Sequence, residues 1–468
     1  MEEKKNNPSK ELREKLLLIR KNGYNVLSDE EIAAGFEFAE GYKSFLDSSK
    51  TEREAVVSAL EILTAHGFRE YKKGDELKPG DRIYKVNRGK AILISVIGTT
   101  PISEGVRICA AHIDSPRLDM KQNPVYEDNG IGYLKTHYYG GIKKYQWTTI
   151  PLSLHGVIIK ADGSSVTVNI GEDENDPVFC VSDLLPHLAN EQMSRPAGKL
   201  IRGEDLNIII GSRPFRDDEE SGAVKLNLLN ILYEKYGVTE ADFVSAELEA
   251  VPAFKAKDVG LDRSLIGGYG HDDRCCSYPA LMAAAESETP VHTSVTVLTD
   301  KEEIGSDGNT GLCSAYLKYF IEDIAQALGS EGRDVLSASE CLSADVNAAF
   351  DPTFPTVSES RNSCFVNKGV CITKYTGARG KSGTSDASAE FAGRIRRLMD
   401  SKGVLWQTGE LGKVDEGGGG TVAMFIANLD VDTIDIGVPV LSMHAPYELI
   451  SKLDLYSAYK AFSAFLAD

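Results

Sequence analysis

The chain has 468 residues, of which 42% are hydrophobic and 26% are charged, a composition typical of folded globular proteins. Its formal net charge of −19 argues against a nucleic-acid or anionic-membrane surface, because both require basic patches. No apolar run approaches the roughly 18 residues of a membrane-spanning helix, and the N-terminal stretch MEEKKNNPSKELREKLLLIRKNG lacks the apolar core of a signal peptide. We therefore expect no membrane or nucleic-acid partner.

The first 120 residues predict helices followed by strands. Residues 9–66 carry helical periodicity with breaks at NGYN and LDSSK, and Ser28 and Thr51 are in position to cap the helices that follow them. The stretches DRIYKVNRGKAILISVIG and GVRICAAHIDS then predict strands, because their apolar residues are dense and β-branched.

The sequence pattern changes near residue 121. The stretch GVIIKADGSSVTVNIG contains two alternating segments joined by Asp-Gly, which predicts an antiparallel hairpin with one solvent-facing side. Near residue 241 the stretch DFVSAELEAVPAF resumes the buried-strand pattern, and strands then alternate with helices such as SYPALMAAAES. The simplest organisation is one α/β domain, formed by residues 1–120 and 241–468, with a β-rich insertion of residues 121–240.

The eight cysteines show no C-x-x-C spacing, and several lie inside apolar segments. Buried free thiols in a reducing cytoplasm explain this pattern better than a disulfide framework or a zinc–thiolate site. A redox pair at Cys275 and Cys276 is a less favoured alternative. We therefore expect a cytoplasmic protein.

Two adjacent glutamates follow the apolar run in TSVTVLTDKEEIGSDG. The run predicts a buried strand, so Glu302 and Glu303 stand at its carboxyl end, where open α/β sheets build their sites. Taken alone, such an acid pair is more typical of a solvated acidic loop.

Four other segments place a histidine or an aspartate at or just after an apolar run. They are VRICAAHIDSPRLD with His112 and Asp114, GGYGHDDRCCSY with Asp272 and Asp273, ECLSADVNAAFDP with Asp345, and IDIGVPVLSMHAPYE with His444. Two histidines and three carboxylates suit two divalent ions, with one imidazole and one terminal carboxylate each and one shared bridge. Three carboxylates and a bridging hydroxide would also balance the charge of the two ions, so such a site can be partly buried.

The spacing within these segments suggests further roles. If the strand at His112 continues to Asp114, both side chains lie on one face, and the carboxylate can accept the second imidazole N–H. Adjacent residues in an extended segment point different ways, so one of Glu302 and Glu303 can bind metal while the other acts as a base.

Together, the segments AAHIDSPRLD, LPHLA, GHDDRCCS, DKEEIGSDG, SADVNAAFDP and LSMHAPYE resemble the aspartyl aminopeptidase family of zinc metallopeptidases, and most closely its bacterial branch. The resemblance covers nearly the whole chain. It implies a zinc-peptidase-like, three-layer α/β catalytic domain with an inserted β-rich dimerisation or lid domain, whose dimers assemble into a tetrahedral dodecamer with enclosed active sites. It also implies two Zn²⁺ per subunit, which Co²⁺ or Mn²⁺ can replace, and the release of single residues from peptides with a free N-terminus.

Position by position, the resemblance assigns His112 and Asp345 to one zinc ion, Glu303 and His444 to the other, and Asp272 to both as the bridge. Glu302 would be the catalytic base, and Asp114 the partner of His112. Because Asp273 directly follows Asp272, where eukaryotic members usually have asparagine, the reverse assignment of the two aspartates stays an alternative.

The resemblance further implies that His187 reaches a neighbouring subunit's active site and donates to the oxyanion of the tetrahedral intermediate. The alternative is an ordinary helix histidine next to Pro186. Lys374 matches a lysine that, as a buried cation, would favour acidic side chains. The Gln-Arg-Tyr motif of acid-preferring members is absent, and Arg379 and Lys381 are other candidate cations, so the preference for acidic or neutral residues stays open.

Two alternatives to an aminopeptidase remain at the level of the sequence. One is another metal-dependent amidohydrolase, such as a deacylase or carboxypeptidase, on the same scaffold. The other is a non-catalytic oligomeric shell, which would not require Glu302. Serine or cysteine nucleophile chemistry has little support, because no G-x-S-x-G motif is present.

Overall fold

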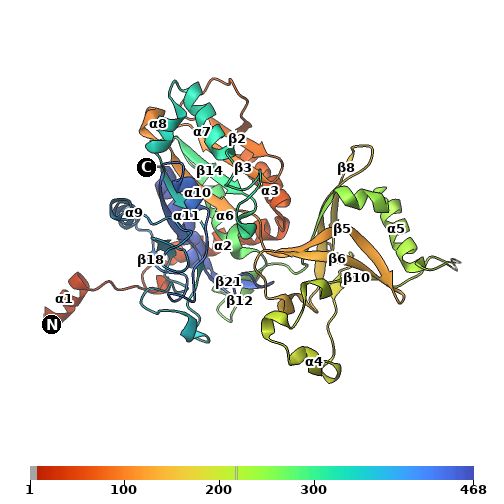
Figure 1. Cartoon of the computed structure of the whole chain (residues 1–468). Helices are drawn as coiled ribbons and strands as arrows, with labels where there is room; N and C mark the ends of the chain where they lie inside the picture. The colour runs from red at the N-terminus through yellow and green to blue at the C-terminus, as the bar shows by residue number, and fades with distance from the viewer. Residues whose placement is uncertain (1–7, 217, 219) are drawn as a thin grey trace.

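The computed structural model describes residues 8–216, 218 and 220–468, which form two bodies (Figure 1). The first, called the nine-stranded body, contains a nine-stranded mixed sheet and an adjoining five-stranded sheet. The second, called the seven-stranded body, is built on strands between residues 117 and 252. Within the described ranges, no helix is long and apolar enough to cross a membrane.

Four parallel strands lie at the centre of the nine-stranded sheet. In spatial order the sheet contains β1 (Arg69–Glu70), β2 (Arg82–Asn87), β3 (Ala91–Val96), β14 (Ser294–Thr299), β4 (Arg107–His112), β15 (Glu340–Ser343), β19 (Asp432–Gly437), β17 (Val370–Thr373) and β18 (Trp406–Thr408). The neighbours β14, β4, β15 and β19 are parallel to one another. Their carboxyl ends therefore share one edge, as expected for an α/β fold.

Helices cover both faces of this sheet. One face packs against α2 (Asp29–Ser48), α3 (Glu52–Ala65), α6 (His271–Ala285), α9 (Ala389–Ser401) and α11 (Lys452–Leu466), and the other against α7 (Tyr316–Ala327), α8 (Gly332–Ser337) and α10 (Ala423–Ala427). Cys109 and Ala111 of β4 enter the first core, whereas Ile108 and Ala110 enter the second, because side chains alternate along a strand. The α/β fold class predicted from the sequence is confirmed.

The helix starts follow the predicted capping residues. The side chains of Ser28 and Thr51 each accept a hydrogen bond from the backbone N–H three residues later. The carboxylates of Glu31 and Glu54 in turn accept the backbone N–H of the cap residue, so both helices begin with a capping box. A short helix α1 (Pro8–Leu16) precedes them and projects away from the seven-stranded body (Figure 1).

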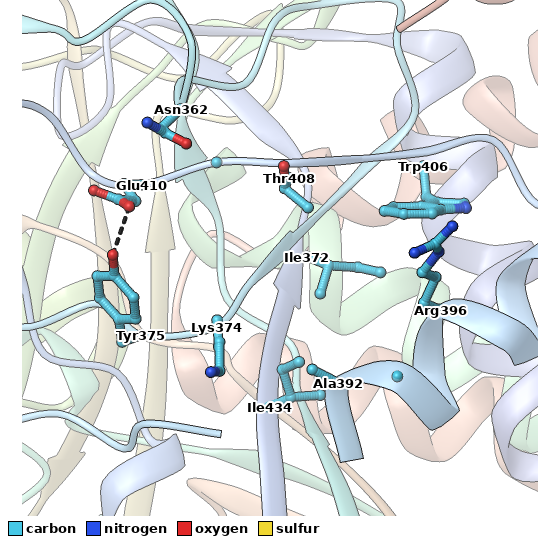
Figure 2. A pocket seen from close by; sticks show the side chains of 12 residues that line it. Asn362, Ile372, Lys374, Tyr375, Ala392, Arg396, Trp406, Thr408, Glu410 and Ile434 are labelled. Atoms are coloured by element: carbon cyan, nitrogen blue, oxygen red, sulfur yellow. Dashed lines mark hydrogen bonds between the residues drawn. The ribbon is translucent and has the colours of Figure 1, made fainter. Parts of the chain in front are cut away.

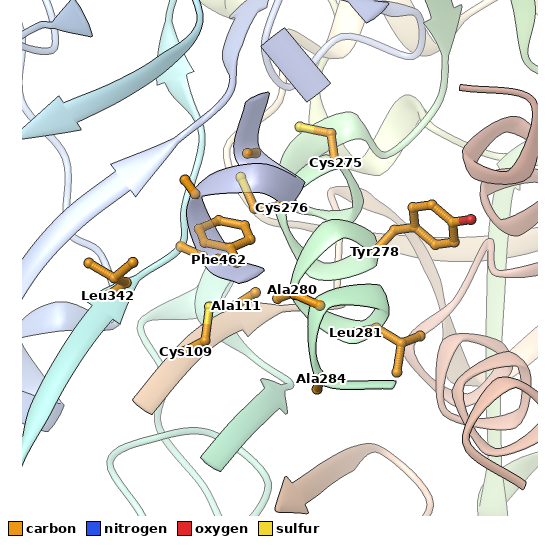
Figure 3. Close-up of a cluster of buried hydrophobic side chains, with 14 of the residues drawn as sticks. Cys109, Ala111, Cys275, Cys276, Tyr278, Ala280, Leu281, Ala284, Leu342 and Phe462 are labelled. Atoms are coloured by element: carbon orange, nitrogen blue, oxygen red, sulfur yellow. The ribbon is translucent and has the colours of Figure 1, made fainter. Parts of the chain in front are cut away.

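The core behind the central strands contains several of the cysteines. Figure 3 shows Cys275 and Cys276 of α6 beside Phe462 of α11, with Cys109 of β4 below them. All eight cysteines are free. Six are buried, as predicted, whereas Cys180 is partly exposed and Cys313 is exposed.

The seven-stranded sheet is antiparallel. Its strands, in spatial order, are β8 (Ser165–Ile170), β7 (Leu152–Ile159), β11 (Ala246–Pro252), β5 (Arg117–Asp128), β6 (Ile131–Tyr139), β10 (Ile208–Gly211) and β9 (Cys180–Val181), and the same body carries α4 (Asn190–Met193) and α5 (Ala223–Tyr236). The predicted hairpin is β7 and β8. Strand β5 begins before residue 121 and β11 lies wholly after residue 240, so the seven-stranded sheet extends past the predicted insertion of residues 121–240 at both ends.

The five-stranded sheet carries the chain past the edge of the large sheet. It contains β12 (Lys257–Val259), β13 (Leu265–Gly268), β21 (Glu448–Ser451), β20 (Pro439–Leu441) and β16 (Asn347–Ala348). Strands β15 and β19 each continue directly into it, as β16 and β20. A Cβ atom on Gly437 would lie 1.7 Å from the carbonyl oxygen of Asp345, so glycine is required where these two segments pass each other.

Candidate metal centre

Three neighbouring strand ends bring the first group of predicted residues together. Thr299, the last residue of β14, pairs with His112, the last residue of β4. A left-handed residue, Lys301 (φ 69°), then reverses the chain into the short helix that begins with Glu302 and Glu303. On the other side of β4, Asp345 follows the end of β15 by two residues. The side chains of these three acids and His112 therefore meet at one edge.

Asp272 and His444 approach this edge from the five-stranded sheet. Asp272 follows β13 and has an extended backbone (φ −80°, ψ 104°) before the regular part of α6. His444 lies three residues beyond β20, in a left-handed conformation (φ 64°). The sequence predicted that an apolar strand ends in His444, but that apolar run is two strands, β19 and β20, in different sheets.

The carboxylate of Asp272 lies between the two histidines. Its Oδ1 is 3.1 Å from His112 Nε2, and its Oδ2 is 3.2 Å from His444 Nε2. Asp345 Oδ1 lies 3.8 Å from His112 Nε2, and Glu303 Oε2 lies 3.5 Å from His444 Nε2. Each histidine thus has its own acid, and the two share Asp272.

Asp273 is held differently from Asp272. Its Oδ2 accepts the backbone N–H of His112 at 3.2 Å, and the side chain is fully buried. Its carboxylate still offers an atom within 4.8 Å of ligand atoms of His112 and Asp345. Only Asp272, however, faces both histidines.

Asp114 orients His112 and the two glutamates together. His112 Nδ1 lies 3.0 Å from the Asp114 carbonyl oxygen and 3.3 Å from its Oδ1. The same carboxylate accepts the backbone N–H groups of Glu302 and Glu303, at 3.1 and 3.2 Å. The imidazole is therefore turned so that Nε2 faces the other ligands.

Glu302 lies beside this group without a direct histidine partner. Its Oε2 is 3.9 Å from His112 Nε2, and the side chain keeps 17% exposure. Burial and the charge of Asp114 raise the pKa of Glu302 to about 7. A carboxylate with partial access to solvent can exchange a proton with water.

Several buried carboxylates lie close together in this group, and a bound cation would offset their mutual repulsion. Burial and the charge of Asp272 raise the pKa of Glu303 well above its ordinary value, and burial and Glu302 do the same for Asp345. Although burial disfavours the imidazolium, Asp272 and Glu303 raise the pKa of His444 to about 10. Glu303 Oε1 is buried without a hydrogen-bond partner among the described atoms. Nitrogen and carboxylate donors of this kind fit Zn²⁺, so the residues present suit a metal centre.

Three supporting residues did not emerge from the sequence. Glu448, the last residue of LSMHAPYE, accepts the backbone N–H of His444 at 2.7 Å and that of Asp272 at 3.1 Å, and so ties the two loops together. Tyr139 donates to Asp114 Oδ2 at 2.8 Å, and Gly141 O lies 2.7 Å from His444 Nδ1. The only signal for Glu448 was an acid four residues after a candidate ligand, and the other two had none.

His187 lies apart from the metal centre. It belongs to a short 3₁₀ turn (Pro186–Leu188) in the seven-stranded body and is exposed. It has no hydrogen bond or ion pair to the centre in the part of the chain that the structure describes, so one subunit does not bring the two together.

Lys374 is also separate from the centre. It lines a cavity of about 340 Å³ with Tyr375, Arg396, Trp406 and Glu410, and Figure 2 shows Tyr375 donating to Glu410. None of the candidate metal ligands lines this cavity. Strand β17 is antiparallel to β19, so Lys374 follows it away from the edge where His112 lies. Lys374 is exposed, whereas the sequence comparison implied a buried cation.

Comparison with known proteins adds an independent line of evidence. The family profile described as aminopeptidase I zinc metalloprotease (M18) matches residues 45–466. A probable M18 family aminopeptidase 1 of Clostridium acetobutylicum is 50% identical over 459 residues, covering 96% of this chain and 99% of that protein.

Solved structures show the same fold. The crystal structure of an M18 aminopeptidase from Thermotoga maritima superimposes with a TM-score of 0.92 at 44% identity, covering 96% of this chain and 99% of that one. The structure of the S. cerevisiae mApe1 dodecamer superimposes with a TM-score of 0.73 at 20% identity, covering 92% and 96%.

Proposed function

The chain belongs to the M18, or aminopeptidase I, family of zinc metalloproteases, and from this premise we propose that it removes single N-terminal residues from peptides with the help of two metal ions. The chain matches nearly the whole length of a relative that is named as a probable aminopeptidase. This match supports cleavage at the N-terminus of a peptide rather than at an internal bond.

The observation that carries the two-ion proposal is the placement of Asp272, with one carboxylate oxygen toward His112 and the other toward His444. We assign His112 and Asp345 to one zinc ion, Glu303 and His444 to the other, and Asp272 to both. Bound zinc would polarise the substrate carbonyl and lower the pKa of a water molecule. Co²⁺ and Mn²⁺ accept the same nitrogen and oxygen donors and can stand in for zinc.

Glu302 is the proposed general base. It is adjacent to the ligand Glu303, lies 3.9 Å from the metal-facing nitrogen of His112 and is not needed to complete either ligand set. In this role its carboxylate takes a proton from the attacking water and passes it to the leaving amine. Asp114 holds the Glu302 backbone and the His112 ring in one arrangement.

His187 is proposed to act in a neighbouring subunit, where its ring N–H would donate to the oxyanion of the tetrahedral intermediate. Support comes from its exposure and from its neighbours Leu184, Leu185 and Leu188, which are 53%, 50% and 70% exposed. Apolar side chains in such a cluster favour burial against another protein surface.

The proposed assembly is a tetrahedral dodecamer of dimers. In it the seven-stranded body, whose strands lie between residues 117 and 252, is the dimerisation or lid element. The distant yeast relative of the same fold is described as a dodecamer. Eight free cysteines support a reducing, cytoplasmic location.

For the released residue we propose an acidic or neutral side chain, with Lys374 as the candidate partner of an acidic one. The cavity lined by Lys374 contains none of the metal ligands. For Lys374 to act, the substrate side chain must therefore extend from the metal centre to this cavity, or the Lys374 of another subunit must lie at the centre. A kcat/KM series on peptides beginning with Asp, Glu, Leu and Ala measures the preference. An acidic preference that survives Lys374→Met would exclude Lys374 from the pocket.

The experiment that tests the proposed activity is a peptide panel with matched free and N-acetylated termini. An aminopeptidase cleaves the free peptides one residue at a time and ignores the blocked ones. A deacylase would release acetate from the blocked peptides, a carboxypeptidase would shorten both from the other end, and a non-catalytic shell would leave both intact.

A further inference from the structure

A single segment of the seven-stranded body touches both halves of the metal centre. Residues 139–141, called here the Tyr-Gly-Gly segment, begin with the last residue of β6. Both histidine ligands proposed above belong to the nine-stranded body. The segment accepts a hydrogen bond from the His444 ring, and it donates one to Asp114, which lies against the His112 ring.

The contact with the His112 half passes through Asp114. The Tyr139 hydroxyl donates to Asp114 Oδ2 at 2.8 Å, and His112 Nδ1 lies 3.3 Å from Oδ1 of this carboxylate and 3.0 Å from the Asp114 carbonyl oxygen. Burial and the nearby Asp114 charge raise the pKa of Tyr139, so the hydroxyl stays a donor. Asp114 is fully buried and cannot replace this donor with bulk water.

The contact with the His444 half is direct. The carbonyl oxygen of Gly141 lies 2.7 Å from His444 Nδ1 and accepts its N–H, which leaves Nε2 free to face Asp272 and Glu303. A backbone acceptor of this kind fixes both the tautomer and the ring orientation of a ligand histidine.

The glycines permit the close approach. Gly140 has a left-handed φ of 75°, and a Cβ on it would lie 3.1 Å from Glu303 Oε2. A Cβ on Gly141 would lie 3.3 Å from His444 Nδ1. Any side chain at either position would therefore press on a proposed ligand.

The ring of Tyr139 packs against Arg117, which forms buried ion pairs with residues of both bodies. The Arg117 guanidinium lies 4.0 Å from the centre of the Tyr139 ring. Arg117 pairs with Glu52 of α3 and with Glu249 of β11, each at 3.1 Å, and all three side chains are buried. The hydroxyl position thus depends on how the seven-stranded body sits against α3.

We infer that the Tyr-Gly-Gly segment positions both metal-binding histidines, so that the seating of the seven-stranded body sets the affinity of the centre for its two ions. Tyr139 is then the positioning residue for the His112 ion and Gly141 for the His444 ion. This inference rests on the proposed two-metal function, and it links the seven-stranded body to the binding of metal ions at the centre.

The test compares Tyr139→Phe with Tyr138→Phe in the full-length, metal-depleted protein, titrated with Co²⁺ while its visible absorption is recorded. Phenylalanine keeps the ring over Arg117 and removes only the hydroxyl, and Tyr138, the neighbour on β6, is partly exposed and has no bond to Asp114. We expect one of two binding steps to weaken about 10- to 100-fold in Tyr139→Phe and neither step to change in the control. Unchanged affinities and spectra in Tyr139→Phe would overturn the inference.

Gly141→Ala provides a second, independent variant, since its added methyl group meets the His444 ring. We expect the other step to weaken by a similar factor, and the double variant to weaken both. Two equally strong steps in Gly141→Ala, or the same step weakened in both variants, would contradict the separate assignments. If the wild type itself binds no Co²⁺ and cleaves no peptide, the proposed function fails instead, and the two failures are therefore distinguishable.

Discussion

The backbone N–H of Glu302 donates to Asp114 Oδ1 at 3.1 Å. The same carboxylate oxygen lies 3.3 Å from His112 Nδ1, so one buried acid fixes the proposed base and the proposed ligand relative to each other. Because the bond to Glu302 is made through the backbone, the side chain of Glu302 can change without disturbing the ligand. This separation makes the base and the metal centre testable one at a time.

Replacing Glu302 by Gln is expected to reduce kcat by about 10²–10⁴-fold, the usual contribution of a general base, while zinc content stays at the wild-type level. The amide has nearly the same shape and keeps the backbone bond to Asp114. Peptide hydrolysis and elemental analysis on the same preparation measure both effects.

The control for this variant is its neighbour. Glu303→Gln removes a proposed ligand, so it should lose zinc as well as activity. If Glu302→Gln hydrolyses peptides at the wild-type rate, Glu302 is not the base; if it loses zinc as readily as Glu303→Gln, it is a ligand.

The two adjacent aspartates should differ in their effect on metal content. Asp272→Asn weakens contacts to both histidine sites, so we expect both ions to bind more weakly and activity to be lost. Asp273→Asn keeps an oxygen that can accept the His112 backbone N–H, and we expect it to retain two ions. Zinc counts per chain for the two variants decide between the assignments, and the opposite pattern would make Asp273 the bridge.

The proposed role of His187 predicts complementation between subunits. His187→Ala and Glu302→Gln should each be nearly inactive as pure oligomers. Mixed oligomers, formed by co-expression with two tags, should regain activity, because some sites receive an intact Glu302 from one chain and an intact His187 from its neighbour. Activity of pure His187→Ala oligomers equal to wild type would remove His187 from the mechanism.

Away from the centre, Asp258 predicts a pH-dependent contribution to stability. Although burial opposes ionisation, hydrogen bonds from Lys43, Lys452 and Arg263 at 2.7–2.8 Å hold the pKa of Asp258 below its usual value. A depressed pKa stabilises the fold above the unfolded value of about 3.9, and this contribution is lost as the pH falls through the folded pKa.

Asp258→Asn should therefore lower the melting temperature at pH 7, by the equivalent of about 1–3 kcal/mol, and the difference from wild type should shrink below pH 4. The matched control is Glu40→Gln, an exposed partner of Lys43, which should cost less than about 1 kcal/mol. A difference that is constant from pH 3 to pH 7 would contradict this account.

The sequence was most informative where local physics decides the outcome. Ser28 and Thr51 predicted two helix starts because capping depends on residues only three apart. The apolar run before Glu302 predicted a buried parallel strand, and parallel strands share their carboxyl ends, which brings Glu302, His112 and Asp345 to one edge.

The remaining parts of the centre depend on contacts between distant segments. Gly141 and His444 are 303 residues apart, and the bond between them exists only because the seven-stranded body is seated against the five-stranded sheet. The spacing of apolar residues along the sequence does not predict how these two parts pack. Glu448 was visible as an acid within a quoted motif, but its two backbone donors come from different loops. Lys374 shows the converse, since a matching position in the sequence lies in a separate cavity in the structure.

The most direct test of the account is to count zinc ions per chain and measure peptide hydrolysis on the same samples, before chelation, after chelation and after zinc is restored. The geometry of Asp272 between His112 and His444 predicts two ions per chain, loss of hydrolysis when they are removed, and recovery as both return. Full hydrolysis by protein that retains no metal would contradict the central claim.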